Sequence, residues 1–394
     1  MGTQVLVLGG GYAGVMAANR LSGREGISVT LVNSRPVFVH RLRLHQRAAG
    51  TDTAEHDFTE VLADDVRLVV GEATRIDAPH RTVELEGGER LTYDRLVYAT
   101  GSHGGNGGVP GVTEHAYPVS TFEAATRLRA TLDGAPVAPV VVVGGGPTGI
   151  ETAAELAETG RDVTLVCGPV LAPYFHPRGR RSTAKQLHEL GVTVLEGTRA
   201  TSVHRNTVVL DDGRELVGIP VWAAGFKPSD LARRSGLSTD RDGRLLTDET
   251  LTSVDDDRIV GAGDAVAPSG VPQRASCQAA LPLAMRAADT VLAHVTGREP
   301  KPLDNPFVGQ CVALGRRAAT FQAARTDDTA VGFYVDGRTG AWLKETVTRQ
   351  IVTSLAREGR KPGSTWMPPS KARARVLERA RAVTSAPPEA RVVA

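Results

Sequence analysis

The sequence has few cysteines, few aromatic residues and little net charge. Only three cysteines occur among 394 residues, Cys167, Cys277 and Cys311, and no two of them form a CxxC pair. This spacing argues against a disulfide framework and against a cysteine-based zinc site, and it favours a reducing, cytoplasmic setting. The ten histidines show no HxxxH or HExxH spacing, so we expect no metal.

Charge and hydropathy argue against two further classes of protein. A net charge of +2 does not suit a dedicated nucleic-acid binder. No apolar run approaches the ~18 residues needed to cross a bilayer. The first apolar strand is expected from about residue 4, so we expect no signal peptide before it. The chain is longer than one hydrophobic core usually supports, which predicts two or three domains.

The sequence does contain a glycine-rich unit that occurs twice. Residues 5–33 and 140–167 each consist of an apolar run, a GxGxxG motif, an Ala-rich helical pattern and a second apolar run. One such motif is a weak signal, but two complete units predict two Rossmann-like dinucleotide-binding domains in an α/β fold. A chain that binds two dinucleotides usually moves electrons between them.

Each glycine of the unit has its own physical reason. Gly9 permits the tight turn out of the first strand, Gly11 lets the backbone approach a pyrophosphate, and Gly14 lets the helix pack close to the sheet. The N–H groups and the positive dipole end of the helix then face the phosphates. The second unit repeats this arrangement with Gly144, Gly146 and Gly149, and with Pro147 at its helix start.

The remaining pattern predicts how the chain is divided. We expect buried parallel strands at 4–9, 29–33, 95–100 and 219–224, and short antiparallel strands at 66–71, 73–78, 81–92 and 199–217. Helices are expected at 122–133, 182–190 and 276–296, and basic helices at 341–358 and 371–383. The last ten residues, 385–394, are expected to be disordered.

Three small-residue turns at strand ends add to the two glycine units. They are Tyr98-Ala99-Thr100-Gly101, Trp222-Ala223-Ala224-Gly225 and Gly261-Ala262-Gly263-Asp264. The first two let the backbone approach a diphosphate or a ring. Asp264, after a buried strand and at a helix start, is placed to accept a proton from a ribityl hydroxyl.

With these motifs the chain resembles the glutathione-reductase-like flavoproteins with two dinucleotide-binding domains. It is most similar to the type II NADH dehydrogenases and the apoptosis-inducing-factor-like members, over residues 4–320. The resemblance implies a discontinuous FAD-binding domain (1–115 and 246–303), an inserted NAD(P)H-binding domain (116–245) and a C-terminal interface region (304–394). It also implies hydride transfer from NADH or NADPH to FAD, and then electron transfer to a quinone or another small acceptor.

The resemblance carries over to individual residues. Glu151 matches a glutamate beside the nicotinamide, although a plain helix-start residue is the alternative, and Gln278 matches the first glutamine of an AQxxxQ stretch near the quinone. The implied FAD positions are Gly9, Gly11, Tyr12, Ala13, Gly14, Asn33, Arg41, Ala73, Thr100, Gly101, Gly263 and Asp264. The implied NAD(P)H positions are Gly144, Gly146, Pro147, Thr148, Gly149, Cys167 and Gly225.

The departures from the family pattern leave the donor nucleotide open. Relatives place an acid at the end of the second strand of each unit, where this chain has Asn33 and Cys167. Cys167 removes the charge that repels the 2′-phosphate of NADP, and three arginines follow at Arg178, Arg180 and Arg181. Those arginines favour NADPH, or they form a solvated helix start.

The residues expected near the electron acceptor also depart from the family pattern. Pro282, interpreted as a helix-starting proline, stands where relatives have a second glutamine, which puts quinone reduction in doubt. A reductase of a carrier protein, an oxidoreductase of a specialised metabolite and a nucleotide-sensing flavoprotein stay open as alternatives. Cys277 is interpreted as a small buried residue. The basic helix at 371–383 is either solvated or a peripheral contact with the inner face of the membrane, and a homodimer is also left open.

Overall fold

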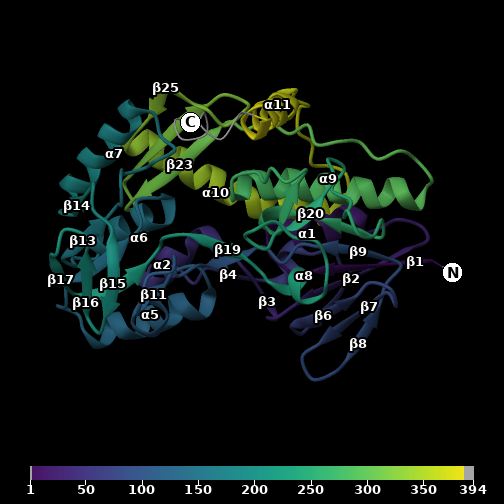
Figure 1. Ribbon diagram of the computed structural model, residues 1–394, viewed down its shortest axis with the longest axis horizontal. Helices are drawn as coiled ribbons and strands as arrows, with labels where there is room; N and C mark the ends of the chain where they lie inside the picture. The colour runs from purple at the N-terminus through teal and green to yellow at the C-terminus, as the bar shows by residue number, and fades with distance from the viewer. Residues whose placement is uncertain (1, 386–394) are drawn as a thin grey trace.

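The computed structural model describes residues 2–385, and its first large element is a five-stranded parallel sheet. Strand β1, which leads into the first glycine turn, lies at its centre (Figure 1). The strand order is β21 (Ile259–Gly261), β9 (Arg95–Tyr98), β1 (Thr3–Leu8), β2 (Ile27–Asn33) and β5 (Arg67–Val70).

A second five-stranded parallel sheet repeats the first. Its order is β11 (Tyr117–Pro118), β18 (Ile219–Trp222), β12 (Val140–Val143), β13 (Val163–Val166) and β14 (Thr193–Leu195). Strand β12, which leads into the second glycine turn, takes the place of β1, and β11 takes the place of β21. The predicted α/β fold with two Rossmann-like domains is therefore confirmed.

The helices that follow the two glycine turns show why the third glycine of each motif is needed. These helices are α1 (Tyr12–Leu21) and α6 (Pro147–Glu158). A Cβ atom on Gly14 would overlap the carbonyl oxygen of Gly9, and one on Gly149 would overlap that of Gly144. Here the close approach of helix to strand excludes a side chain.

Each sheet carries a three-stranded antiparallel meander. The first consists of β6 (Ala73–Asp77), β7 (Thr82–Leu85) and β8 (Arg90–Thr92), and the second of β15 (Ala200–His204), β16 (Thr207–Leu210) and β17 (Glu215–Val217). The strand predicted at 66–71 was assigned to such an antiparallel group, which was wrong. It is β5, which pairs parallel with β2, because a short apolar run does not reveal the direction of its partner.

Two crossing segments join the sheets side by side. Strand β10 (Ser102–Gly104) leaves the first unit and pairs antiparallel with β19 (Phe226–Pro228), which returns to it. After β19, Leu231, Ala232 and Leu237 already pack into the core of the first sheet. The predicted boundary at 245/246 remains a prediction, and this packing favours a boundary close to β19.

The return path leads to helix α9 (Cys277–Val295), which packs along α1. The connecting elements are β20 (Leu245–Thr247), η2 (Gly263–Ala265) and β22 (Val266–Pro268). The other short elements are β3 (Val37–Val39), η1 (Arg41–Arg43), α2 (Leu44–Ala49), β4 (Glu55–Asp57), α3 (Phe58–Val61), α4 (Val112–His115), α5 (Phe122–Gly134), α7 (Pro177–Glu189) and α8 (Leu231–Arg234).

The C-terminal part bridges the two units. Its antiparallel sheet contains β23 (Gly309–Leu314), β24 (Ala318–Ala324) and β25 (Ala330–Val335). Helix α10 (Gly337–Arg360) then runs from that sheet towards α1, and α11 (Ala372–Ser385) ends the described chain (Figure 1). Disorder was predicted at 385–394, which lies almost wholly outside the described residues. Within the described range, no helix is long and apolar enough to cross a membrane.

The contrast between two glycines of one motif gives a prediction on stability. Gly14→Ala should lower the free energy of unfolding by about 3 kcal/mol, because the added Cβ must displace the backbone of Gly9. Gly11→Ala is the matched control, since its Cβ would meet nothing within 4 Å, and it should cost about 1 kcal/mol at most. Urea unfolding of the ligand-free proteins measures both values, and equal losses would contradict the packing argument.

Candidate functional site

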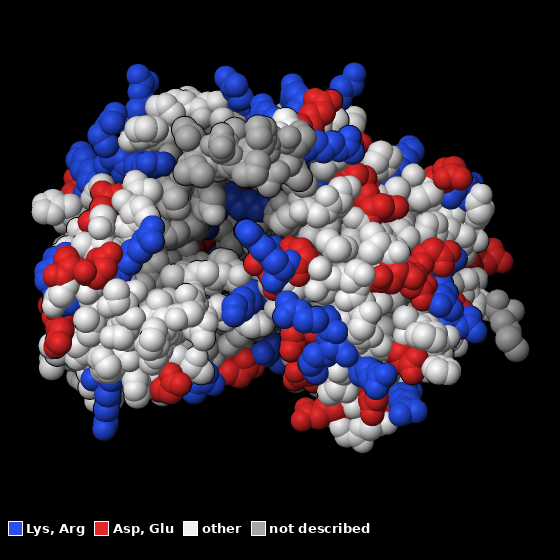
Figure 2. All heavy atoms as spheres, in the orientation of Figure 1, with Lys and Arg blue, Asp and Glu red and all other residues white. Residues whose placement is uncertain are grey.

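Both glycine turns open on one continuous cavity. Its volume is about 1770 Å³, whereas a site for one small ligand is typically about 300–1,000 Å³, so it has room for more than one ligand. The face drawn in Figure 2 is hollowed near its middle, between the part that holds β13 and the part that holds β1, and Lys and Arg side chains stand around the opening.

Most residues predicted for the site line this cavity together. They are Gly9, Gly11, Tyr12, Ala13, Asn33, Arg41, Ala73, Thr100, Gly101, Gly144, Gly146, Pro147, Thr148, Glu151, Cys167, Gly225, Gly263, Asp264 and Gln278. Gly14 and Gly149 do not line it, because each lies beneath its helix, against the preceding turn. Their role is to bring the helix close to the strand.

The glycines at the cavity wall differ from those two. A Cβ atom built on Gly11 or Gly146 would meet nothing within 4 Å, and the same holds for Gly101 and Gly225. Protein packing therefore does not demand glycine at Gly11 and Gly146, whose φ values are negative. Glycine there leaves free the space that a ligand's phosphates would fill.

At the first glycine turn, two buried polar groups lack a hydrogen-bond partner within the protein, which suits a bound dinucleotide. Arg41 Nη1 donates to the carbonyl oxygen of Ser102 at 2.6 Å, and Ser102 Oγ donates to Asp264 at 2.8 Å. Arg41 Nη2 and Thr100 Oγ1 are buried without a hydrogen-bond partner. Burial lowers the pKa of Arg41, a cost that a neighbouring anion would offset. These residues fit a bound diphosphate.

Tyr12 holds the segment that carries Arg41. The backbone N–H of Leu42 donates to the Tyr12 hydroxyl at 3.1 Å, and that hydroxyl lies 2.8 Å from His40 Nδ1. Burial, aided by Arg43, lowers the pKa of His40 to about 3, so this imidazole is neutral, and in the tautomer with an unprotonated Nδ1 it accepts a hydrogen bond from the Tyr12 hydroxyl. Tyr12 thus acts by positioning Arg41.

Asn33 is largely occupied by the backbone. Its Oδ1 accepts from the N–H of Gly10 at 2.9 Å, and its Nδ2 donates to the carbonyl oxygen of Arg35 at 2.8 Å. The amide therefore closes the glycine turn. Only its remaining N–H and lone pair are available to a ribose.

Glu151 has a partner that sequence reasoning missed. Lys344, on α10, places its Nζ 2.6 Å from Glu151 Oε1, and the same oxygen accepts from the backbone N–H of Ala313 at 3.0 Å. His45 Nδ1 lies 3.8 Å from the other oxygen, Oε2. Glu151 and His45 are buried, and the Lys344 side chain is nearly so. Residues from α6, α10, β23 and α2 therefore converge on one carboxylate.

Electrostatics keep this pair charged. Burial alone would raise the pKa of Glu151, but Lys344, His45 and the N–H of Ala313 together outweigh it, and the pKa of Glu151 lies below its usual range. Burial acts in the opposite sense on Lys344, and Glu151 keeps the pKa of this lysine above its usual range. Lys344 lies beyond residue 320, the limit of the recognised resemblance. In the sequence, Lys344 is only one of several cations in a helix that is expected to be basic.

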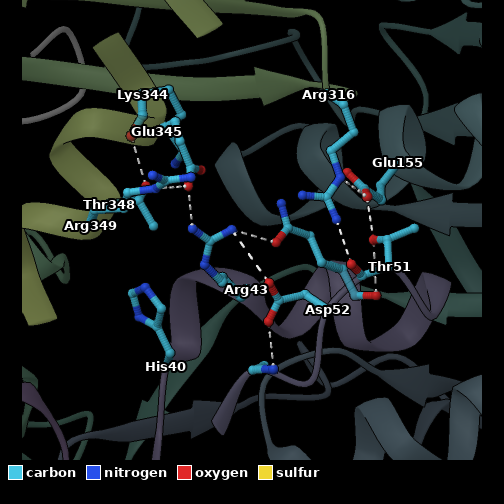
Figure 3. A network of polar contacts seen from close by, with 12 residues as sticks. His40, Arg43, Thr51, Asp52, Glu155, Arg316, Lys344, Glu345, Thr348 and Arg349 are labelled. Atoms are coloured by element: carbon cyan, nitrogen blue, oxygen red, sulfur yellow. Dashed lines mark hydrogen bonds and ion pairs between the residues drawn. The ribbon is translucent and has the colours of Figure 1, made fainter. Parts of the chain in front are cut away.

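Further polar contacts link the elements that surround Glu151 and Lys344 (Figure 3). Arg43, beside α2, donates to Glu345 of α10 at 2.7 Å and lies 3.7 Å from Asp52. Arg316, in the β23–β24 turn, donates to Glu155 of α6 at 3.0 Å. The cavity is thus enclosed by parts of the chain that are distant in sequence.

The acceptor-side residues are placed differently from the prediction. The amide of Gln278 is engaged by the backbone: Nε2 donates to Gly309 O at 3.1 Å, and Oε1 accepts from Val308 N at 3.0 Å. Pro282 was predicted to start a helix, which was wrong. It lies inside α9, whose first turn is capped by Ser276. Pro282 has no side-chain amide, and Gln278 has only one side-chain N–H left for a ligand.

The remaining cysteines at the cavity are thiols. Cys277 and Cys311 both line the wall, and neither is in a disulfide. Burial raises the pKa of both, that of Cys311 to about 12, despite the nearby Lys344. No cluster of His, Cys, Asp and Glu in residues 2–385 could hold a metal ion.

The three arginines predicted near the second ribose do not line the cavity. Arg178 and Arg181 are exposed on α7, and Arg180 donates to the carbonyl oxygen of Pro173 at 3.0 Å. Of the two interpretations left open for these arginines, the solvated helix start agrees with the exposure of Arg178 and Arg181, and no residue of α7 lines the cavity. Arg199 lines the wall instead.

Known proteins resemble this chain in sequence and in structure. Residues 3–288 match the family described as pyridine nucleotide-disulphide oxidoreductases. The NADH dehydrogenase-like protein Rv1812c of Mycobacterium tuberculosis is 30% identical over 351 residues, which cover 81% of this chain and 87% of that protein. A type II NADH:quinone oxidoreductase of Staphylococcus haemolyticus is 25% identical, with 90% and 96% covered.

The fold also matches solved structures. The sulfide:quinone oxidoreductase of Aquifex aeolicus superposes with a TM-score of 0.76, covering 90% of this chain and 92% of that one. Its sequence is 18% identical, so this likeness concerns the fold alone.

The buried pair generates a prediction on stability. Lys344→Met should cost about 3–5 kcal/mol near pH 7, because it leaves the buried Glu151 carboxylate without its cation, and Glu151→Gln in the same chain should restore much of the loss. The stabilisation should be present between about pH 4.3 and pH 10.4, the ordinary pKa values of the two groups. It should fall as Glu151 is protonated below that window or Lys344 deprotonated above it.

A double-mutant cycle measured by urea unfolding tests this coupling. Lys185→Met is the matched control, since Lys185 forms an exposed pair with Glu189 at 3.7 Å and should change stability by about 0.5 kcal/mol or less. Additive losses at Glu151 and Lys344 would show that the pair is not coupled.

Proposed function

The chain belongs to the pyridine nucleotide-disulphide oxidoreductase family, and from that premise we propose that it is an FAD-dependent oxidoreductase that passes electrons from NAD(P)H to a quinone. The observation that carries the proposal is the single cavity on which both glycine turns open. Two dinucleotides bound at those turns would meet within it, beside Glu151 and Lys344. The relatives named as NADH:quinone oxidoreductases support the same reaction class.

FAD would be held by the first unit. Gly11 and Gly101 leave room for the diphosphate, Arg41 Nη2 and Thr100 Oγ1 supply unused polar groups, and Asp264 faces the same space. When bound, FAD would accept a hydride from the nicotinamide and pass two electrons to the acceptor. The protein contributes binding and orientation, and its buried walls exclude water.

NAD(P)H would be held by the second unit. Gly146 and Gly225 leave the open space there, and the uncapped N-terminus of α6 faces the phosphates. Glu151 would orient the carboxamide, because Lys344 and the N–H of Ala313 fix its carboxylate in one position. A fixed acceptor costs less conformational entropy on binding than a mobile one.

The acceptor would enter between α9 and α10. The side chains that line this part of the cavity are mainly apolar: Leu281, Pro282, Val347, Ile351 and Met367. An apolar wall suits the ring of a quinone. The amide of Gln278 is engaged and Pro282 has none, so the polar side chains that could orient its carbonyls are those of α10, Thr348, Gln350 and Ser354. A membrane contact through α11 and a homodimer remain predictions.

Three glycine substitutions test the two nucleotide sites separately. Gly11→Val should abolish FAD binding, because its side chain would enter the open space at the first turn. Gly146→Val should leave the protein yellow but block its reduction by NAD(P)H under anaerobic conditions, while dithionite still reduces it. Gly134→Val is the control, since it also lies in open space but away from the cavity.

Absorbance spectra of the folded variants give the readout. A native protein that is colourless and cannot be reconstituted with FAD would refute the proposal. Retention of FAD by Gly11→Val would show that the flavin binds elsewhere.

The acceptor wall predicts the order of substrates. Because two amide groups that could orient a quinone are missing or engaged, soluble dyes and short-chain quinones should turn over at least about tenfold faster than long-tail quinones. Flavin reduction by NAD(P)H should be the same in every assay. Steady-state rates with a quinone series in detergent and in liposomes measure this order. Menaquinone turnover in liposomes as fast as flavin reduction would contradict it.

A further inference from the structure

The end of strand β13 lacks a polar group for the nucleotide's second ribose. In a Rossmann-like unit this ribose lies at the end of the second strand, where an acid would select NADH. Here the position is held by Cys167, which is 7% exposed and whose thiol lies 3.9 Å from Leu165 O. Burial raises the pKa of this thiol to about 12, so it carries no charge.

The segment after β14 supplies the polar groups instead. Gly197 N–H donates to Gly168 O at 2.8 Å, and Thr198 forms an isolated antiparallel bridge with Gly168. This segment therefore crosses the end of β13, directly beside the ribose position. Arg199 follows the bridge and lines the cavity together with Cys167 and Gly168.

The acidic and basic side chains of this segment, Glu196 and Arg199, make different contacts. Glu196 is engaged by the backbone, because its Oε1 accepts from the N–H of Leu171 at 2.5 Å, and it does not line the cavity. Arg199 uses its backbone N–H to reach Asp211 at 3.1 Å. Its guanidinium makes no recorded hydrogen bond or ion pair within residues 2–385. Among the residues that line the cavity beside Cys167, Arg199 offers a cation and none offers a carboxylate, although the charge of Glu196, outside the lining, acts on the Cys167 thiol.

We propose that Arg199 binds the 2′-phosphate of NADPH, so that this chain uses NADPH at least as well as NADH. The inference rests on the proposed function, since it concerns the donor site of that reaction. A guanidinium binds phosphate through charge-assisted hydrogen bonds, which are stronger than neutral ones. NADH has only a hydroxyl at this position and gains little from Arg199.

Binding of nucleotide fragments tests the inference without any redox reaction. Calorimetry on the flavin-loaded protein should show that 2′,5′-ADP binds more tightly than 5′-ADP. Arg199→Ala should weaken 2′,5′-ADP about tenfold or more and leave 5′-ADP unchanged. Arg181→Ala is the matched control, because Arg181 is exposed on α7 and does not line the cavity. It should leave both affinities unchanged.

Steady-state kinetics give the second readout. Arg199→Ala should lower kcat/KM for NADPH about tenfold and leave that for NADH within about twofold. Equal binding of the two fragments by the native protein, or a loss caused by Arg181→Ala in place of Arg199→Ala, would overturn the inference. If neither nucleotide reduces the flavin while 2′,5′-ADP still depends on Arg199, the proposed reaction fails and the binding site stands.

Discussion

The buried ion pair between Glu151 and Lys344 is the interaction on which the site depends. It joins α6 of the second unit to α10 of the C-terminal part, and His45 brings α2 of the first unit against the same carboxylate. A buried charge that loses its partner is strongly destabilising, so α10 cannot move away without cost. The first unit, the second unit and the C-terminal part therefore all line the cavity and meet at the Glu151 carboxylate.

The two glycine units give this enclosed space its chemistry. At Gly14 and Gly149 the absence of a side chain lets helix and strand approach, and at Gly11 and Gly146 it keeps the cavity wall open. The second sheet repeats the strand order of the first, and both glycine turns, each followed by a helix N-terminus, line the same cavity. A hydride donor and a flavin can thus be held against each other in one cavity.

The sequence reveals the parts of this arrangement that are local. The apolar runs at β1 and β12, the glycine turns and the helices after them depend on neighbouring residues, and their positions agree with the structure. The direction of β5 and the place of Pro282 within α9 depend on packing partners, and both predictions were wrong.

Lys344 and Arg199 were missed because each reaches the site through a long-range contact. Lys344 acts on Glu151 from a helix beyond the recognised resemblance, and Arg199 reaches the ribose position through the bridge between Gly168 and Thr198. In a chain with 46 lysines and arginines, one more basic residue carries no local signal of either role. The predicted arginines on α7 were chosen for their closeness in sequence, which did not place them at the cavity.

The central claim is that one cavity carries both halves of an electron transfer. Double-mixing stopped-flow spectroscopy tests it most directly: the oxidised flavoprotein is first mixed anaerobically with NADPH, and then with a short-chain quinone. We predict that the flavin is bleached in the first step and regains its colour in the second, each at a rate no slower than steady-state turnover. Bleaching slower than turnover, or a flavin that stays reduced in excess quinone, would contradict the account.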